Sequence, residues 1–310
     1  MSQNVDVIFL GTGGGAPSPK RYLPAVALRF GGKWLLFDAG EGVQMRLRES
    51  PLGWGGLQGV FISHLHGDHV LGLPGLLMSL GMARVETPLA LYGPAGLEEL
   101  IHAVLRGCRV QLPFPLHIHT IEGDGGVLIE GDDWKVEAAP LLHRIPCYGF
   151  FWSEGERPGR FYPDQAAALG IPPGPLYGQL QSGCPVTAPD GAVIGPERVM
   201  GPSRAGRKIA YCTDTAPCDV VLRNAEGADL LIHDCTFAAD LDDEARISGH
   251  STTVQAAQQA LQAGCRRLAL THISARYTDD DLLLTEARAI FPHTFVARDL
   301  LSVSIPARKD

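Results

Sequence analysis

The chain has 310 residues, of which 45% are hydrophobic, so it is long enough for one large domain with a substantial core. Its seven scattered cysteines form no Cys-x-x-Cys pair, and its start has neither the basic residues nor the apolar stretch of a secretory signal, so a reduced, cytoplasmic protein is expected. No run approaches the ~18 apolar residues of a membrane helix, and the net charge of −8 argues against nucleic-acid binding through a global positive field while leaving a local basic patch open.

A strand is expected over residues 6–10, followed by the glycine-rich run Gly11-Thr12-Gly13-Gly14-Gly15. This run has the composition of a dinucleotide-binding loop, but it leads to Pro17 and Pro19 and not into a helix, so the geometry that cradles a phosphate is not set up. Strands over 25–30 and 33–37, joined by a Gly-Gly turn, predict a hairpin, and a helix is expected over 43–49.

Four metal-competent side chains then lie within six residues, between a strand expected over 59–62 and a helix expected over 70–80: His64, His66, Asp68 and His69. Imidazole and carboxylate are ligands of zinc and similar divalent ions, and loops at the carboxyl ends of strands are where α/β folds gather their active sites. In an extended loop, His64 and His66 point the same way and can share one ion. Asp68 and His69 follow a glycine and can turn toward a second ion.

Three further candidate ligands each close a predicted strand: His143, Asp214 and His272. The seven residues divide into two groups, because a carboxylate has two oxygens and Asp214 can bridge. We expect one ion to be held by His64, His66 and His143 and the other by Asp68, His69 and His272. Zinc suits these ligands, and manganese suits a carboxylate-bearing site as well.

Late in the chain, strands alternate with helices, including a helix over 251–263 with Ser251 as its expected cap. Many strands first and alternating strands and helices later predict two packed sheets with helices outside. The segment 154–207 breaks this pattern, since it is rich in Gly and Pro and has little periodicity. We expect a single core over 1–153 and 208–310, with 154–207 inserted in it as a protruding arm.

Five stretches of the chain together resemble bacterial ribonuclease Z, a tRNA 3′-processing endonuclease family of the metallo-β-lactamase superfamily. They are Phe37–Gln44, the ligand run at 63–69, Pro140–Phe150, Gly249–Thr252 and Leu270–Tyr277. The resemblance implies a four-layer αββα sandwich, two divalent ions, a homodimer, and precursor tRNA as the partner. The arm is similar to the family's exosite, which grips the tRNA away from the cut, and its centre contains Gly174, Pro175 and Tyr177.

The resemblance also implies roles for individual residues. A metal-bound hydroxide would attack the phosphorus, Asp68 would bind a metal and accept the water's proton, and His250 would stabilise developing charge or protonate the leaving oxygen. Asp38 and Asp234 would support histidines of the site from behind. Lys20, Arg21 and Arg276 lie on expected loops and could contact phosphates.

Two departures from the family pattern stand out. The family has Arg-Asn where this chain has Arg21-Tyr22, in the loop that senses the CCA end of tRNA, so discrimination against CCA-bearing tRNA is an open question. It has His-Glu-Ala-Thr where this chain has His233-Asp234-Cys235-Thr236, so the carboxylate that supports His250 is one methylene shorter.

Two other functions fit parts of the pattern. Another hydrolase of the superfamily, acting on a small phosphodiester or a (thio)ester, would use the same metal ligands but has no need of an arm. A tRNA-binding protein with a structural metal would more often present a closed, cysteine-rich site.

Overall fold

The computed structural model describes residues 4–308, and most of the strands fall into two seven-stranded sheets. The first sheet has the order β18-β1-β3-β4-β5-β6-β7 and the second has the order β17-β15-β14-β13-β10-β9-β8. The strands of the first sheet are β1 (Val5–Gly11), β3 (Ala25–Phe30), β4 (Lys33–Phe37), β5 (Leu57–Phe61), β6 (Leu89–Gly93), β7 (Leu116–Thr120) and β18 (Ser302–Ile305). Those of the second are β8 (Gly126–Glu130), β9 (Trp134–Pro140), β10 (Tyr148–Glu154), β13 (Lys208–Cys212), β14 (Leu230–Asp234), β15 (Leu268–Thr271) and β17 (Thr294–Val296).

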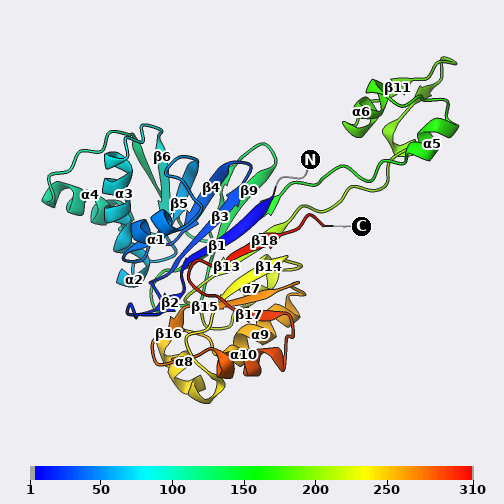
Figure 1. Ribbon diagram of the computed structural model, residues 1–310. Helices are drawn as coiled ribbons and strands as arrows, with labels where there is room; N and C mark the ends of the chain where they lie inside the picture. Colours follow the sequence, from blue (N-terminus) through cyan, green and yellow to red (C-terminus); the bar gives the residue numbers. More distant parts are fainter. Residues whose placement is uncertain (1–3, 309–310) are drawn as a thin grey trace. The chain divides into compact units, whose positions relative to one another are not determined.

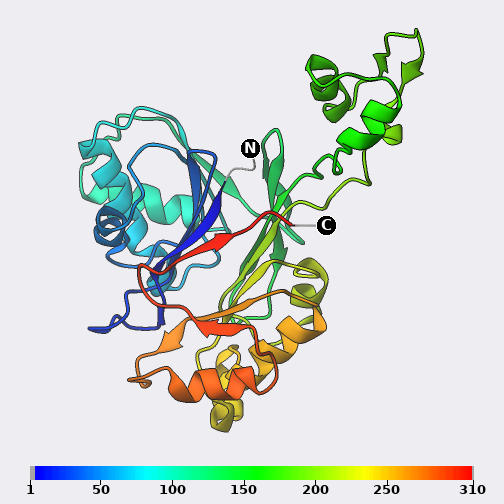
Figure 2. The same ribbon diagram turned by 45° about the vertical axis from the view of Figure 1, so that its right-hand side comes forward.

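Helices cover the outer face of each sheet, which confirms the expected four layers (Figures 1 and 2). The first sheet carries α1 (Val43–Glu49), α3 (Gly72–Met82) and α4 (Leu97–Gly107). The second carries α7 (Asp219–Asn224), α9 (Thr253–Gln262) and α10 (Asp281–Arg288). Leucines of α3 and alanines of α9 enter the two separate cores formed in this way. Because successive strand residues point to opposite faces, Ile8 and Leu10 face the helices while Phe9 contacts Phe295 of the other sheet.

Aromatic side chains fill the layer between the sheets. Phe37 of β4 lies 5.8 Å from Phe150 of β10, and Phe30 lies 5.4 Å from Trp152, measured between ring centroids. Large aromatic surfaces removed from water supply much of the packing free energy of such a layer. The two sheets are therefore held face to face by residues from many points of the chain.

The strands β4 to β7 run parallel, as do β13, β14, β15 and β17. Carboxyl ends of parallel strands meet at one edge of a sheet, so residues that follow these strands are brought together. Asp38, His64, Asp214 and His272 each come directly or shortly after such a strand. The topology thus places the candidate ligands at one end of the sandwich.

The remaining short elements lie near that end or connect the strands: β2 (Gly13–Gly14), β16 (Ile273–Ser274), α2 (Gly67–Val70), η2 (Ala239–Leu241) and α8 (Asp242–Ser248). The glycine-rich run forms no phosphate cradle, since β2 pairs with β16 instead of leading into a helix. A side chain at Gly14 would collide with the imidazole of His272, because its Cβ would lie only 2.5 Å from ring atoms. The glycine there allows the backbone to approach a candidate ligand closely.

The chain forms two compact units. Within the described residues, the first comprises 4–131, 135–153 and 208–306, and the second comprises 132–134, 154–207 and 307–308. In the second unit, Arg157 pairs with Arg204 and Phe161 with Met200 in a two-stranded antiparallel ribbon. Glu154 and Arg207 form an ion pair at the base of the ribbon.

Beyond this ribbon the second unit folds into a small head with its own core. Its elements are α5 (Pro163–Ala168), α6 (Pro175–Gln181), β11 (Val186–Thr187), β12 (Val193–Ile194) and η1 (Pro196–Arg198). The core consists of Ala166, Ile171, Leu180, Val186, Ala188, Ile194 and Val199. Tyr177 packs on Phe161 at 4.7 Å and its hydroxyl donates to the Ile171 carbonyl at 3.3 Å, whereas Gly174 and Pro175 are exposed.

The expected cap of the 251–263 helix is wrong by one residue. Thr252 caps α9: its hydroxyl accepts from the Gln255 N–H, and the Gln255 side chain accepts from the Thr252 N–H. Ser251 instead donates its hydroxyl to the Thr215 carbonyl at 2.6 Å. A reciprocal capping box satisfies two backbone donors that the helix itself cannot.

Thr252→Ala is expected to lower the free energy of unfolding by about 1 kcal/mol, because the cap is lost. For a chain of this size the melting temperature falls by ~2 °C, measurable by circular dichroism or calorimetry. Thr285→Ala is the matched control, since its hydroxyl binds the Asp281 carbonyl in an exposed part of α10 and caps no helix start. An equal loss in both variants would contradict a specific capping contribution.

Candidate metal centre

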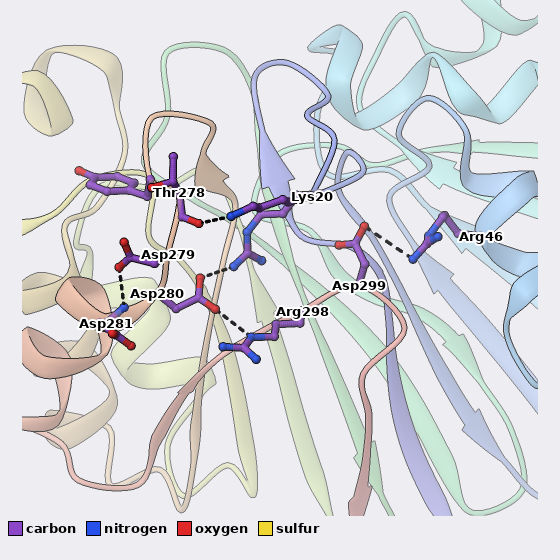
Figure 3. A pocket seen from close by; sticks show the side chains of 10 residues that line it. Lys20, Arg46, Thr278, Asp279, Asp280, Asp281, Arg298 and Asp299 are labelled. Atoms are coloured by element: carbon purple, nitrogen blue, oxygen red, sulfur yellow. Dashed lines mark hydrogen bonds and ion pairs between the residues drawn. The ribbon is translucent and has the colours of Figure 1, made fainter.

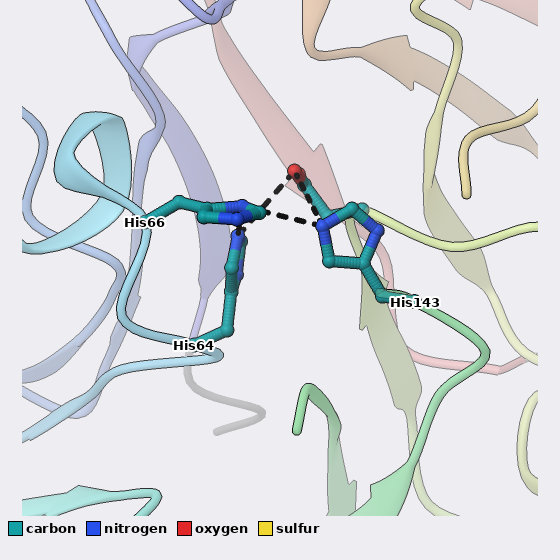
Figure 4. Close-up of side chains that lie close together, drawn as sticks. His64, His66 and His143 are labelled. Carbon is teal, nitrogen blue, oxygen red and sulfur yellow. Dashed lines mark hydrogen bonds and ion pairs between the residues drawn. The ribbon is translucent and has the colours of Figure 1, made fainter. Parts of the chain in front are cut away.

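The predicted ligands of the first group converge on one point. His64 Nε2 lies 2.9 Å from His66 Nδ1, and His143 Nε2 lies 3.3 Å from the same atom. Figure 4 shows these three rings turned toward one another. Asp214 completes the group with Oδ2 at 3.5 Å from His64 Nε2. Ligand atoms of all four residues lie within 4.8 Å of one another.

The second group gathers beside the first. His272 Nε2 lies 3.3 Å from Asp68 Oδ2, and His69 Nε2 lies 3.6 Å from the same oxygen. Asp214 Oδ1 lies 3.1 Å from His69 Nε2 and 3.2 Å from His272 Nε2. Asp214 therefore turns one oxygen to each group, as a bridging carboxylate would.

The hydrogen bonds behind the rings assign their tautomers. His143 Nδ1 donates to the Gly249 carbonyl at 2.8 Å, and His69 Nδ1 donates to Asp38 Oδ2 at 2.8 Å. His272 Nδ1 donates to Thr236 Oγ1 at 2.7 Å, because that hydroxyl itself donates to Asp234. Each of these rings turns its Nε2 toward the centre, and this is the nitrogen through which it would bind a metal ion.

The charges of the centre also fit a cation. Burial, and then the neighbouring His69, lower the pKa of His64 to about 2, and burial lowers the pKa of His66 and His143. Burial would raise the pKa of Asp214, but His272 and His69 outweigh it and hold that pKa well below its usual range. Burial likewise opposes charge on His69, yet Asp214 and Asp38 hold its pKa well above its usual range, so in the metal-free protein a proton stands where a bound cation would replace it. Lone pairs and carboxylates are thus assembled around a point that requires positive charge.

One buried atom tests whether a divalent ion fits. His69 Nε2 is buried and has no hydrogen-bond partner among the described residues, although it faces both carboxylates. A buried ring nitrogen left without a partner is costly unless a ligand takes its lone pair. The donor set of imidazoles and carboxylates fits a divalent ion at this position.

Asp38 is the anchor behind this centre. Its carboxylate accepts from four donors: the Ser63 N–H, the Ser63 hydroxyl, His69 Nδ1 and the Tyr211 hydroxyl. Ser63 in turn lies 3.0 Å from His64 Nδ1, so Asp38 orients histidines of both groups. Sequence reasoning identified Asp38 but missed Ser63 and Tyr211, which carry no motif of their own.

Asp38→Asn is expected to lower metal affinity about 10- to 100-fold, because an amide offers one acceptor oxygen to four donors. Asn tolerates the left-handed backbone of this position, where φ is 57°, so the fold is retained. Titration of the metal-free protein with zinc, followed by calorimetry, measures the change. Unaltered affinity would show that the four contacts do not tune the centre.

His250 stands at the rim of the centre. Its Nδ1 donates to Asp234 Oδ2 at 2.8 Å, so the shorter aspartate reaches the ring. Burial lowers the pKa of His250, but Asp234 outweighs it and raises that pKa to about 9. Thr236, also missed in the sequence, contacts Asp234, His250 and His272 through one hydroxyl.

Three residues of the centre have left-handed backbone conformations: Asp38, Asp214 and His272, with φ of 57°, 55° and 58°. Such conformations are uncommon outside glycine and cluster at functional sites. They turn the chain sharply at the strand ends. The turn aims each side chain across the edge of its sheet.

An open cavity of about 440 Å³ adjoins the centre. Its walls include His66, Asp68, Asp214, His250 and His272, together with Glu41 and Arg144, which sequence reasoning did not single out. Both lie inside the quoted motif stretches, and Arg144 directly follows the ligand His143. That adjacency was the available signal.

The expected phosphate-binding residues lie elsewhere. Lys20 and Arg21 line a second cavity of about 480 Å³ (Figure 3), and Lys20 Nζ donates to the Thr278 carbonyl. Arg21 is buried, and both terminal nitrogens of its guanidinium donate inside the protein, to Thr12, the Ala297 carbonyl and Asp280. Arg276 is exposed and lies over the Phe237 ring at 4.9 Å. The expectation for Arg21 is therefore corrected to a structural role.

Comparison with known proteins gives consistent matches. A profile described as Beta-lactamase superfamily domain matches residues 189–273, and one described as Anti-Pycsar protein Apyc1 matches residues 5–114. The chain is 46% identical to Ribonuclease Z of Salinibacter ruber, covering 98% of this chain and 96% of that protein. It is 43% identical to Ribonuclease Z of Acaryochloris marina, covering 98% of each.

Solved structures agree. Human tRNase Z, short form, is 30% identical with a TM-score of 0.73, over 97% of this chain and 99% of that chain. The metallo-beta-lactamase fold protein YhfI from Bacillus subtilis is 20% identical with a TM-score of 0.68, over 97% and 99%, and supports the fold alone. No helix within residues 4–308 has the length and apolar character needed to cross a membrane.

Proposed function

The chain belongs to the ribonuclease Z family, and from this premise we propose that it is a tRNA 3′-processing endoribonuclease, which removes the 3′ trailer of precursor tRNA by hydrolysing one phosphodiester. The observation that carries the proposal is the convergence of the predicted ligands on two adjoining groups with Asp214 between them. The match to ribonuclease Z over nearly the whole chain favours this function over the alternative, a hydrolase that acts on small esters.

We propose two divalent ions, zinc or manganese, held by the two ligand groups with Asp214 between them. When bound, such ions supply a polarised water as nucleophile and offset the charge of the phosphoryl oxygens. Asp68 is oriented by the Gly15 N–H, which donates to its Oδ2 at 2.7 Å, and it accepts the proton of the attacking water. The bond between phosphorus and the 3′ oxygen breaks as the new oxygen–phosphorus bond forms.

His250 is proposed to donate the proton that the leaving 3′ oxygen takes up. The Asp234 contact holds its Nδ1 and fixes the ring in the cavity wall, where the departing oxygen is released. The products are a tRNA with a 3′ hydroxyl and a trailer with a 5′ phosphate. Lys20, which lines the second cavity, and Arg276, which lies over Phe237, remain proposed phosphate contacts.

The arm is proposed to hold the body of the tRNA. Supporting this, its head folds around its own core and leaves Gly174 and Pro175 exposed. We also propose a homodimer, supported by Met45 and Leu71, apolar side chains that are more than half exposed. Seven cysteines without disulfide partners support a reducing, cytoplasmic location.

Cleavage of a 3′-extended precursor tRNA by the purified protein tests the function. We expect one cut at the 3′ boundary, loss of activity after chelation, and recovery on addition of zinc or manganese. A chromogenic phosphodiester assayed in parallel separates the alternatives. Cleavage of the small ester without any cleavage of tRNA would make the chain a phosphodiesterase for small substrates.

A further inference from the structure

The cavity beside the metal centre is poor in positive side chains. Three carboxylates line it, from Glu41, Asp68 and Asp214. Among the described residues that line it, Arg144 is the only lysine or arginine. Besides the proposed metal ions, a polyanionic strand that enters this cavity meets one permanently charged cationic side chain among the described lining residues, the guanidinium of Arg144.

The backbone that carries Arg144 is fixed on both sides. His143 Nδ1 donates to the Gly249 carbonyl, and the Leu142 N–H donates to Thr215 Oγ1 at 3.2 Å. The Leu141 N–H donates to the Cys147 carbonyl at 2.8 Å and closes the loop. The position of the Arg144 Cα is therefore determined by the same contacts that hold His143.

The side chain of Arg144 is not used by the fold. It is exposed and forms no hydrogen bond or ion pair with any residue from 4 to 308. The other arginines near this end of the sandwich differ: Arg21 binds Asp280, Arg46 binds Glu49, and Arg276 binds Ser274. A guanidinium that extends from a fixed backbone position and has all five donors free is suited to bind a ligand from solution.

We propose that Arg144 binds a phosphate of the RNA strand adjacent to the bond that is cut. This inference rests on the proposed function, since it requires an RNA substrate. The planar guanidinium can donate two parallel hydrogen bonds to phosphate oxygens, which an ammonium cannot. The contact offsets the repulsion between the substrate and Glu41, the carboxylate of the cavity that holds no proposed ion, and it fixes the register of the strand.

The experiment compares Arg144→Ala and Arg144→Lys with Arg106→Ala. Arg106, near the end of α4, is exposed, and its side chain forms no hydrogen bond or ion pair with a described residue and lines neither of the two cavities. Its variant therefore makes the same change of charge away from the centre. Cleavage of precursor tRNA is measured between roughly 50 and 200 mM salt, the range over which proteins that contact nucleic-acid phosphates lose affinity. A small chromogenic phosphodiester is assayed in parallel.

Arg144→Ala is expected to raise KM for tRNA about tenfold and to flatten the dependence of log(kcat/KM) on log salt by about 0.7 to 0.9, one phosphate contact. Arg144→Lys should restore the salt slope but only part of KM. Cleavage of the small diester should not change, because it has no adjacent phosphate. Arg106→Ala should match the wild type on both substrates.

Three outcomes overturn the inference in distinguishable ways. If Arg144→Ala matches Arg106→Ala while the wild type cuts tRNA, Arg144 binds no phosphate and the proposed function stands. If Arg144→Ala loses the small diester as well, the arginine acts through the fold of the metal centre. If the wild type never cuts tRNA, the proposed function fails, and the inference fails with it.

Discussion

Asp214→Asn is expected to reduce cleavage of both precursor tRNA and a small phosphodiester about 1,000-fold or more, because one residue serves both ligand groups. Each Asp214 oxygen faces a different group, at 3.5 Å from His64 Nε2 and 3.1 Å from His69 Nε2. An amide keeps the shape but replaces one charged oxygen by a donor, which points at ring nitrogens or at the ion.

Asparagine is chosen over alanine because of the backbone. With φ at 55°, alanine would add strain at this position, whereas asparagine adopts the left-handed region at least as readily as aspartate. Asp229→Asn is the control: Asp229 is buried but accepts from the Lys208 N–H, away from the centre. Metal content measured by mass spectrometry should fall in Asp214→Asn only. Full metal content with full activity would contradict the bridging role.

Removing the head of the arm is expected to lower kcat/KM for precursor tRNA by about 100-fold or more, equivalent to ~3 kcal/mol of binding free energy. The small phosphodiester should be cleaved as before, because none of the residues that would bind the metal ions lies in the arm. The structure gives the place to cut. The Tyr162 N–H donates to the Val199 carbonyl, so residues 163–198 can be replaced by Asn-Gly, the usual two-residue hairpin turn.

The ribbon between Arg157–Arg204 and Phe161–Met200 stays intact in this variant. A milder companion is Ile171→Ala, which opens the core of the head without shortening the chain. If the head grips tRNA, Ile171→Ala should fall between the wild type and the deletion. Equal tRNA cleavage by all three proteins would show that the head takes no part in binding.

The sequence predicts those features of the fold and the site that are marked by residues close together in the chain. His64 to His69 occupy six residues, and His143, Asp214 and His272 each follow a strand, so pattern and topology rules brought them together before any coordinates. The cap was predicted at Ser251, one residue too early, although Gln255 stands three residues after Thr252, as a capping box requires.

Other features had no local signal. Arg21 is buried by partners 259 and 276 residues away, which no pattern around it indicates. The core of the arm's head draws single apolar residues from short elements between glycines and prolines, so neither helical nor strand periodicity appears. Ser63, Tyr211 and Thr236 act through hydroxyl groups whose importance depends on what they face.

The order in which the chain is synthesised has a consequence for its metal. Asp68 and His272, which meet in one ligand group, are separated by 204 residues. At about 5–20 residues per second, a ribosome needs on the order of 10–40 s to reach the second after making the first. Strand β1 likewise waits for its edge partner β18, which pairs Val5 with Ile305. A nascent chain therefore exposes an incomplete set of histidines for many seconds. Both ligand groups can bind their metal ions only after the chain has been synthesised at least as far as His272.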